Sequence, residues 1–233
     1  MDFSTWEPVY EAILADFGYD RAADERVRDL LSSLYQATDA EPYEPEAAAF
    51  AGQTVAIAGA GPSLSAERKA VRRADAIVAA STAADRLMEA QTSPDIVVTD
   101  LDKHPETVRE LTNSGTPVVV HAHGDNTAAI REAVPTFDCE WVLPTTQAEP
   151  VGPVRNFGGF TDGDRAAFLA DALGADRLVF PGWDFDDETV DAEKERKLTW
   201  AERLLYWLEG RRDDHFNVLD GRRDAIDTKA LPP

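Results

Sequence analysis

Two acidic side chains set close together, Asp100 and Asp102, are the clearest sign of chemistry in this 233-residue chain. They follow a short apolar run at residues 96–98, which is typical of a strand buried on both faces. Side chains alternate along a strand, so both carboxylates are predicted to point one way while Leu101 points back. Adjacent carboxylates repel each other unless a cation lies between them, and Mg²⁺ binds carboxylates and phosphate oxygens. The alternative is that both are loop residues, one of them capping the helix after Pro105.

Strands and helices alternate along the chain from residue 53 onward. Strands are predicted at residues 54–58, 76–80, 95–99, 117–122, 140–143 and 177–180. Helices are predicted at residues 107–111, 127–134 and 164–173, with a further helix opening at residue 191. This alternation predicts an α/β fold with a doubly wound, mostly parallel sheet and helices on both faces. Ligands bind such a sheet outside the carboxyl ends of its strands, which is where the polar clusters of this sequence fall.

The first 36 residues have a different pattern and are predicted to form two helices. Gly18 ends the apolar periodicity of the first helix, and Asp20 or Asp24 is predicted to start the second. A polar, proline-bearing linker follows at residues 38–46. The sequence therefore predicts an N-terminal helical extension over residues 1–45 and an α/β domain that carries the chemistry over residues 46–233.

A glycine-containing loop follows the first predicted strand, and two hydroxyl residues follow the second. The residues concerned are Gly59, Gly61, Pro62, Ser63, Ser81 and Thr82. Glycines allow tight turning and close approach of a ligand, so a phosphate or an adenosine is expected here. A dinucleotide fingerprint would need a glycine where Leu64 stands and an acid after the second strand, so a dehydrogenase is disfavoured. The structural alternative is a tight turn from strand to helix.

The fourth predicted strand ends in His121 and His123, which share one face of the strand, followed by Asp125 and Asn126. Histidines in such a place bind a transition metal, or they hydrogen-bond a neighbour or a substrate. Asp125 or Asn126 can simply cap the next helix. Asp125 can instead complete an acidic cluster with Asp100 and Asp102.

Two later segments carry basic side chains beside acids. Arg165 stands next to Asp162 and Asp164 in a glycine-rich stretch, where it suits a phosphate site, whereas the acids also suit the first turn of a helix. Lys194 and Lys197 are three residues apart and project together from a predicted helix. Surface pairing with neighbouring glutamates is the alternative for both lysines.

Composition excludes several classes of protein. The chain has 44 acidic and 23 basic residues and a net charge of −21, so a general nucleic-acid binder is disfavoured. The acids are spread along the chain, which favours a surface suited to high salt. A single cysteine excludes an intrachain disulfide framework. No apolar run is long enough to span a bilayer, and no signal peptide is recognisable, so a cytoplasmic location is expected.

Five of these motifs, in their order along the chain, resemble the archaeal 6-hydroxymethyl-7,8-dihydropterin pyrophosphokinase family, which is related to thiamine pyrophosphokinase. They are Gly-Ala-Gly-Pro-Ser-Leu at 59–64, Thr-Asp-Leu-Asp at 99–102, His-Ala-His-Gly-Asp-Asn at 121–126, Gly-Phe-Thr-Asp-Gly-Asp-Arg at 159–165 and Lys-Glu-Arg-Lys-Leu at 194–198. The resemblance covers residues 53–211, and the N-terminal helices carry little of it. The acidic, lysine-poor composition would suit a haloarchaeal member.

The resemblance implies that the β,γ-diphosphate of ATP moves to the hydroxymethyl group of a reduced pterin and that AMP is released, in tetrahydropterin or folate-type cofactor synthesis. It implies small-molecule substrates and Mg²⁺, and it leaves a homo-oligomer open. It assigns Mg²⁺ to Asp100 and Asp102, with Asp125 as a candidate third ligand. Diphosphate neutralisation falls to Arg165, Lys194 and Lys197, and nucleotide binding falls to the glycine loop with Ser81 and Thr82. Asn126, Asp162 or Asp164 would hold the pterin ring, and His121 or His123 would orient the hydroxymethyl group.

Three other functions are compatible with parts of the sequence. A thiamine pyrophosphokinase-like enzyme would use the same motifs on another acceptor. A non-catalytic module that binds ATP would need the glycine loop but not the acidic pair. A glycosyltransferase-like enzyme would use Asp100 and Asp102 to bind the metal of a nucleotide sugar, but it leaves Lys194 and Lys197 unexplained.

Overall fold

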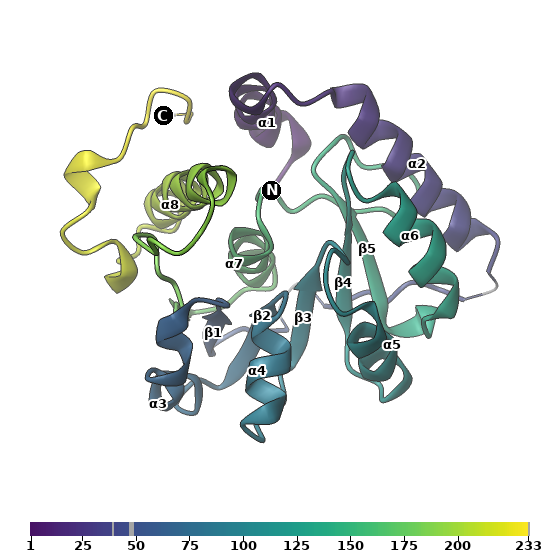
Figure 1. Cartoon of the computed structure of the whole chain (residues 1–233), viewed down its shortest axis with the longest axis horizontal. Helices are drawn as coiled ribbons and strands as arrows, with labels where there is room; N and C mark the ends of the chain where they lie inside the picture. Colours follow the sequence, from purple (N-terminus) through teal and green to yellow (C-terminus); the bar gives the residue numbers. More distant parts are fainter. Residues whose placement is uncertain (39, 47–48, 233) are drawn as a thin grey trace.

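A six-stranded sheet with all strands parallel forms the centre of the computed structural model, which describes residues 1–38, 40–46 and 49–232 (Figure 1). Across the sheet the strands follow the order β5-β4-β3-β2-β1-β6. Their bounds are β1 Thr54–Ala58, β2 Ala76–Ala80, β3 Ile96–Thr99, β4 Val118–Ala122, β5 Val142–Thr146 and β6 Arg177–Val179. The chain therefore steps outward from β1 to β5 and then returns to add β6 beside β1. The predicted α/β fold with a parallel sheet is confirmed.

Eight α-helices cover the two faces of this sheet in the described part of the chain. Their bounds are α1 Phe3–Phe17, α2 Arg21–Gln36, α3 Arg68–Val71, α4 Ala83–Glu89, α5 Pro105–Asn113, α6 Thr127–Ala133, α7 Asp162–Ala172 and α8 Ala192–Arg212. Alternation along β1 sends Val55 and Ile57 into the core shared with α1, α7 and α8. It sends Ala56 and Ala58 into the core shared with α2 to α6. Figure 1 shows α7 and α8 on one side of the sheet and α3, α4 and α5 on the other.

The two N-terminal helices separate and pack on opposite faces of the sheet. Trp6 and Tyr10 of α1 lie in the core beneath α7 and α8, whereas Leu31 and Tyr35 of α2 lie in the other core. Asp20 caps α2 by accepting a hydrogen bond from the Ala22 amide at 3.0 Å. Residue 39 of the predicted linker lies outside the described residues, and the division of the chain at residue 45 stays a prediction.

The fifth strand differs from its predicted bounds. Residues 140–143 were the expected strand, but Cys139–Trp141 form a 3₁₀ turn and β5 runs from Val142 to Thr146, through Pro144. Proline is tolerated because β5 is an edge strand, where one side of the backbone needs no ladder partner. The shift brings Gln147 to the carboxyl edge of the sheet, directly after β5 and beside the end of its neighbour β4. No described helix combines the length and apolar character needed to cross a membrane.

Candidate active site

The loops at the carboxyl ends of the strands enclose a cavity of about 720 Å³, which lies in the size range of small-molecule sites. The predicted site residues that line it are Gly59, Gly61, Ser81, Thr82, Asp100, Asp102, His123, Asp125, Asp162, Arg165, Lys194 and Lys197. The predicted residues that do not line it are Pro62, Ser63, His121, Asn126 and Asp164. The sheet edge thus brings together polar clusters that are up to about 140 residues apart in the sequence.

The acidic pair reaches the cavity by a turn, which corrects the prediction of strand alternation. β3 ends at Thr99, and Leu101 adopts a left-handed backbone conformation with φ of 65°. The Leu101 amide donates to Thr99 Oγ1 at 3.0 Å, and the Asp102 amide donates to Asp100 Oδ1 at 3.1 Å. Leu101 is buried in the core, as expected, and its burial helps to hold this uncommon conformation in place.

The two carboxylates of the pair are electrostatically different. Burial raises the pKa of Asp100, but the hydrogen bond to His123 Nε2 at 3.3 Å and the charge of Arg165 outweigh burial and lower it. Burial and the negative charge of Asp100 raise the pKa of Asp102. The pair therefore consists of a firmly ionised acid beside one that holds its proton more tightly, and a cation between them would favour ionisation of both.

His121 and Asn126 support the site from behind. His121 is buried, and its Nδ1 lies 3.1 Å from Thr145 Oγ1; burial and the Arg165 charge lower its pKa, which favours the neutral ring. The Asn126 amide nitrogen donates to the carbonyls of Asp100 and His121, both at 2.7 Å. Its amide oxygen accepts from the His123 backbone at 3.0 Å. Asn126 therefore ties the turn after β3 to the loop after β4.

The backbone amides of the glycine loop donate hydrogen bonds to the loop that follows β6. The Gly59 and Gly61 amides donate to the carbonyls of Pro181 and Gly182, both at 2.9 Å. The Ser63 amide donates to Asp184 Oδ2, also at 2.9 Å. A Cβ on Gly61 would lie 2.3 Å from that same carboxylate oxygen. The glycines therefore have the structural role that was the alternative in the sequence analysis, because they let two backbones pack directly in a tight turn. The loop still borders the cavity.

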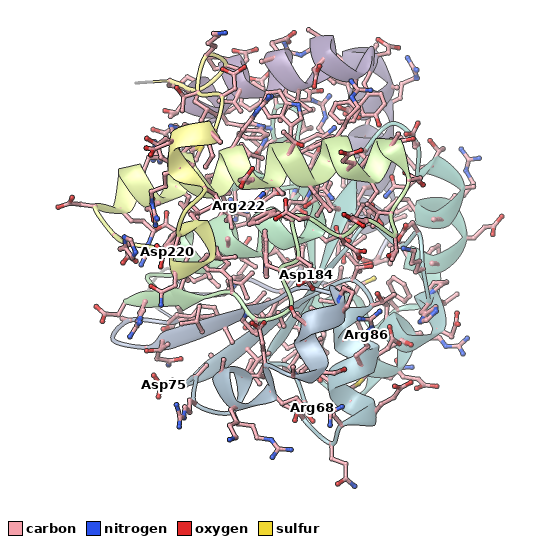
Figure 2. The ribbon with its side chains drawn as sticks, turned by 60° about the vertical axis from the view of Figure 1, so that its left-hand side comes forward. Arg68, Asp75, Arg86, Asp184, Asp220 and Arg222 are labelled. Carbon is pink, nitrogen blue, oxygen red and sulfur yellow. The ribbon has the colours of Figure 1, made fainter. Side chains whose placement is uncertain are left out.

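The loop after β6 is held at its far end by the C-terminal segment. Arg222 donates to both carboxylate oxygens of Asp186 and also pairs with Glu202 of α8. Its guanidinium lies 5.3 Å from the centre of the Phe185 ring. Figure 2 labels Arg222, with Asp184 between it and Arg86 of α4 in that view. The cavity wall formed by this loop therefore depends on residues that follow α8.

The two acids in the first turn of α7 have different surroundings: one caps the helix and the other lines the cavity. Asp164 is buried and closes a capping box with Thr161, whose hydroxyl donates to it at 2.6 Å. Asp162 lines the cavity and accepts from Arg165 at 3.0 Å. Burial and the Asp100 charge raise the pKa of Asp162 to about 8, although Arg165 acts in the opposite direction. The acids of this motif thus have two separate roles in the geometry.

The two lysines of α8 line the cavity but differ in their pairing. Asp191 caps the helix by accepting from the Lys194 amide at 2.8 Å. Lys197 Nζ lies 2.8 Å from Glu193 Oε1, and this bond outweighs the effect of burial and raises the pKa of Lys197. Within the described residues Lys194 has no ion-pair partner. Its ammonium group is therefore the freer of the two for an anionic ligand.

Several residues that line the cavity were not predicted from the sequence. Arg86 donates to the Gly61 carbonyl at 3.1 Å and adds a cation to the glycine side of the cavity. Gln147 lies behind Arg165 and accepts a hydrogen bond from its Nη2 at 3.3 Å. Three aromatic residues, Tyr19, Phe160 and Trp183, also border the cavity. Arg86 was detectable because it follows Ser81 and Thr82 by one helical turn, whereas Gln147 depended on the shifted bounds of β5.

The donor groups of the cavity fit a hard cation that is shared with a substrate. Asp100, Asp102 and Asp162 present carboxylate oxygens, the ligands that Mg²⁺ prefers. Within the described ranges, no three His, Cys, Asp or Glu side chains converge closely enough to hold a metal ion by themselves. A cation bound here would therefore take further ligands from water and phosphate oxygens.

Comparisons with known proteins agree with this geometry. Residues 28–189 match the family described as 6-hydroxymethylpterin diphosphokinase MptE-like. The chain is 38% identical over 229 residues to a Methanothermobacter thermautotrophicus protein named 6-hydroxymethyl-7,8-dihydropterin pyrophosphokinase, covering 90% of this chain and 96% of the relative. A Methanocaldococcus jannaschii protein of the same name is 32% identical over 241 residues, covering 93% and 99%.

A solved structure shares the fold. It is described as the MAf glycosyltransferase from Magnetospirillum magneticum AMB-1, and it superposes with a TM-score of 0.51 at 18% identity. The superposition covers 79% of this chain and 35% of that chain. At this level of identity the likeness concerns the fold alone.

Proposed function

The chain belongs to the 6-hydroxymethylpterin diphosphokinase MptE-like family, and on that basis we propose that it transfers the β,γ-diphosphate of ATP to the hydroxymethyl group of 6-hydroxymethyl-7,8-dihydropterin. In this step the hydroxymethyl oxygen forms a bond to the β-phosphorus. The bond from that phosphorus to the oxygen bridging the α- and β-phosphates breaks, and AMP leaves. The hydroxyl proton passes to a base or to solvent.

One observation carries this proposal: acids and cations from separate segments border a single cavity at the carboxyl edge of the sheet. Asp100 and Asp102 come from the turn after β3, Arg165 comes from α7, and Lys194 comes from α8. Transfer of a phosphoryl or diphosphoryl group needs mainly positioning and charge neutralisation. The acids suit a metal ion, and the cations suit the phosphate oxygens that the metal leaves uncovered.

Mg²⁺ is the cofactor that this arrangement favours. Asp100 and Asp102 would hold it, with Asp162 or Asp125 as a nearby third acid. When bound, the ion would supply positive charge beside the substrate phosphates and offset the charge that develops during transfer. Arg165 would form two parallel hydrogen bonds to phosphate oxygens, and Lys194 would add a point charge.

The acceptor side of the cavity is assigned to His123, Asp162 and the aromatic residues. His123 lines the cavity and is bonded to Asp100, so it is the histidine suited to orient the hydroxymethyl group. Among the three candidates for the pterin ring, Asp162 borders the cavity, whereas Asn126 and Asp164 have their polar atoms engaged elsewhere. Trp183, a partly buried aromatic residue that borders the cavity, would stack on a flat heterocycle.

A product analysis tests the reaction. The protein is incubated at high salt with ATP, Mg²⁺ and 6-hydroxymethyl-7,8-dihydropterin, and the nucleotide and pterin products are separated. AMP together with a pterin diphosphate is the expected result, whereas ADP or an absence of turnover would contradict the proposal. Thiamine in place of the pterin serves as the control acceptor and should give no AMP. High-salt adaptation, a cytoplasmic location, the absence of nucleic-acid partners and the oligomeric state stay predictions.

A further inference from the structure

Asp24 of α2 is a buried carboxylate outside all the sequence motifs, with 3% of the residue exposed. It accepts three hydrogen bonds, each from a different segment of the chain. Tyr10 Oη of α1 donates at 2.7 Å, the Gly124 amide donates at 2.6 Å, and Gln147 Nε2 donates at 2.8 Å. The three donors compensate the carboxylate for its loss of hydration, but removal of the carboxylate would leave these buried donors unsatisfied.

Two of these three donors belong to segments that carry site residues. Gly124 stands between His123 and Asp125, both of which line the cavity. Gln147 donates to Asp24 through its amide nitrogen and accepts from Arg165 through its amide oxygen. A carboxylate can only accept, so Asp24 fixes which end of the Gln147 amide faces Arg165.

The approach of the loop to α2 is unusually close. A Cβ on Gly124 would lie 2.8 Å from the Ala23 Cβ and 3.3 Å from Asp24 Oδ1. The missing side chain at position 124 is what lets the backbone amide reach the carboxylate. This contact is independent of the Gln147 bond and joins α2 directly to the loop after β4.

We propose that Asp24 is a positioning residue for the diphosphate transfer, holding the loop of His123 and Asp125 and, through Gln147, the guanidinium of Arg165. The inference rests on the proposed function and extends it to the N-terminal helices. Tyr19, Asp20, Ala23 and Asp24 itself, at the junction of α1 and α2, border the cavity. The two helices therefore complete the site, and α2 supplies a carboxylate that aligns two of its walls.

Exchanging the carboxylate of Asp24 and the amide of Gln147 distinguishes a positioning role from a general effect on the stability of the fold. Gly124 donates to Oδ1 of Asp24, whereas Tyr10 and Gln147 donate to Oδ2. In Asp24→Asn an amide NH₂ faces the Gln147 NH₂, and in Gln147→Glu two carboxylates face each other. In the double variant the new amide at position 24 keeps an oxygen toward Gly124 and donates to the new carboxylate at position 147.

The expected kinetic result is loss in each single variant and recovery in the double variant. Each single substitution should lower kcat by about tenfold or more, because small displacements of positioning groups carry costs of this size. The double variant should regain at least half of that loss on a logarithmic scale. Tyr35→Phe is the matched control, because it removes a buried hydrogen bond from α2 to the Val142 carbonyl, at the start of β5. It should lower the melting temperature and leave kcat unchanged.

Two outcomes would overturn the positioning role. One is a kcat within twofold of wild type in Asp24→Asn, and the other is a double variant no more active than the weaker single variant. Hydrogen–deuterium exchange gives a readout that does not need turnover: Asp24→Asn should speed exchange in residues 121–127 and at the start of α7, and Tyr35→Phe should not. If wild type releases no AMP, the proposed reaction fails, and the exchange result still decides whether Asp24 positions these segments.

Discussion

Asp162 accepts a hydrogen bond from Arg165 at 3.0 Å and nevertheless has its pKa raised to about 8. Burial and the nearby charge of Asp100 outweigh the guanidinium. The pair is almost closed off from solvent, with 7% of the Arg165 side chain and 11% of the Asp162 side chain exposed. The cavity thus contains more negative charge than its own cations neutralise, as expected of a place where a further cation binds.

This relationship predicts how the stability of the metal-free protein depends on pH. The folded state keeps a proton on Asp162 that the unfolded state releases above about pH 4, so this group lowers the free energy of unfolding as pH rises toward about 8. The slope cannot exceed about 1.4 kcal/mol per pH unit for one group. Asp162→Asn should remove this slope, as measured by denaturant unfolding in EDTA. Identical pH profiles for the variant and the wild type would contradict the raised pKa.

The acidic pair should be essential for turnover and dispensable for folding. Asp102→Asn removes a carboxylate that borders the cavity and that, among the described residues, forms an ion pair only with the exposed Lys103. We therefore expect kcat to fall by at least about 100-fold with an unchanged circular dichroism spectrum. Glu106→Gln is the matched control, because it neutralises an exposed acid four residues away that does not line the cavity. Near-normal activity in Asp102→Asn would contradict the proposed metal-binding role of Asp102.

Lys194 should contribute more to catalysis than Lys197. Its ammonium group has no ion-pair partner in the described part of the chain, whereas Lys197 is engaged by Glu193. Lys194→Ala should lower kcat/KM for ATP by about 100-fold, the size seen when one group that stabilises transition-state charge is lost. Lys197→Ala should cost less, and Lys69→Ala, which removes an exposed lysine of α3, should cost nothing measurable. Equal losses for Lys194 and Lys69 would exclude the role of Lys194.

Two glycine-to-alanine changes should act in opposite directions on stability. A Cβ on Gly61 would meet Asp184 Oδ2 at 2.3 Å and the Gly182 carbonyl at 2.6 Å, so Gly61→Ala should destabilise by roughly 1–3 kcal/mol. A Cβ on Gly210 in α8 meets nothing within 4 Å, so Gly210→Ala should stabilise by about 0.5–1 kcal/mol. Both free energies come from denaturant titrations, and a neutral Gly61→Ala would show that the two loops separate easily.

The parts of the fold that follow from local pattern could be predicted from the sequence. Apolar runs and helical periodicity gave the parallel α/β sheet, and the rule for its carboxyl edge gathered the acids and lysines into one cavity. The same local view placed the acids after Thr161 in the first turn of a helix, and Asp164 lies there, in the capping box of α7. These features depend on residues within a few positions of each other.

The parts that depend on distant contacts could not be predicted. The packing of the glycine loop is one of them, because the Gly59 and Gly61 amides donate to the carbonyls of Pro181 and Gly182, about 120 residues further along the chain. The course of β5 through Pro144 depends on its place at the sheet edge, which the sequence does not show. Asp24 was predicted only as a candidate start of the second helix, since its contacts with Gly124 and Gln147 arise only where two loops meet α2.

The position of β6 has a consequence for how the chain folds while it is being synthesised. β1 pairs with β2 early in the chain, but its other edge waits for β6 and the loop that receives the amides of Gly59 and Gly61. On the ribosome, about 120 residues must be added before that edge can close, and Arg222 emerges later still. During this interval β1 exposes an unpaired edge, so a nascent chain paused before residue 177 is the form most open to mispairing and chaperone capture.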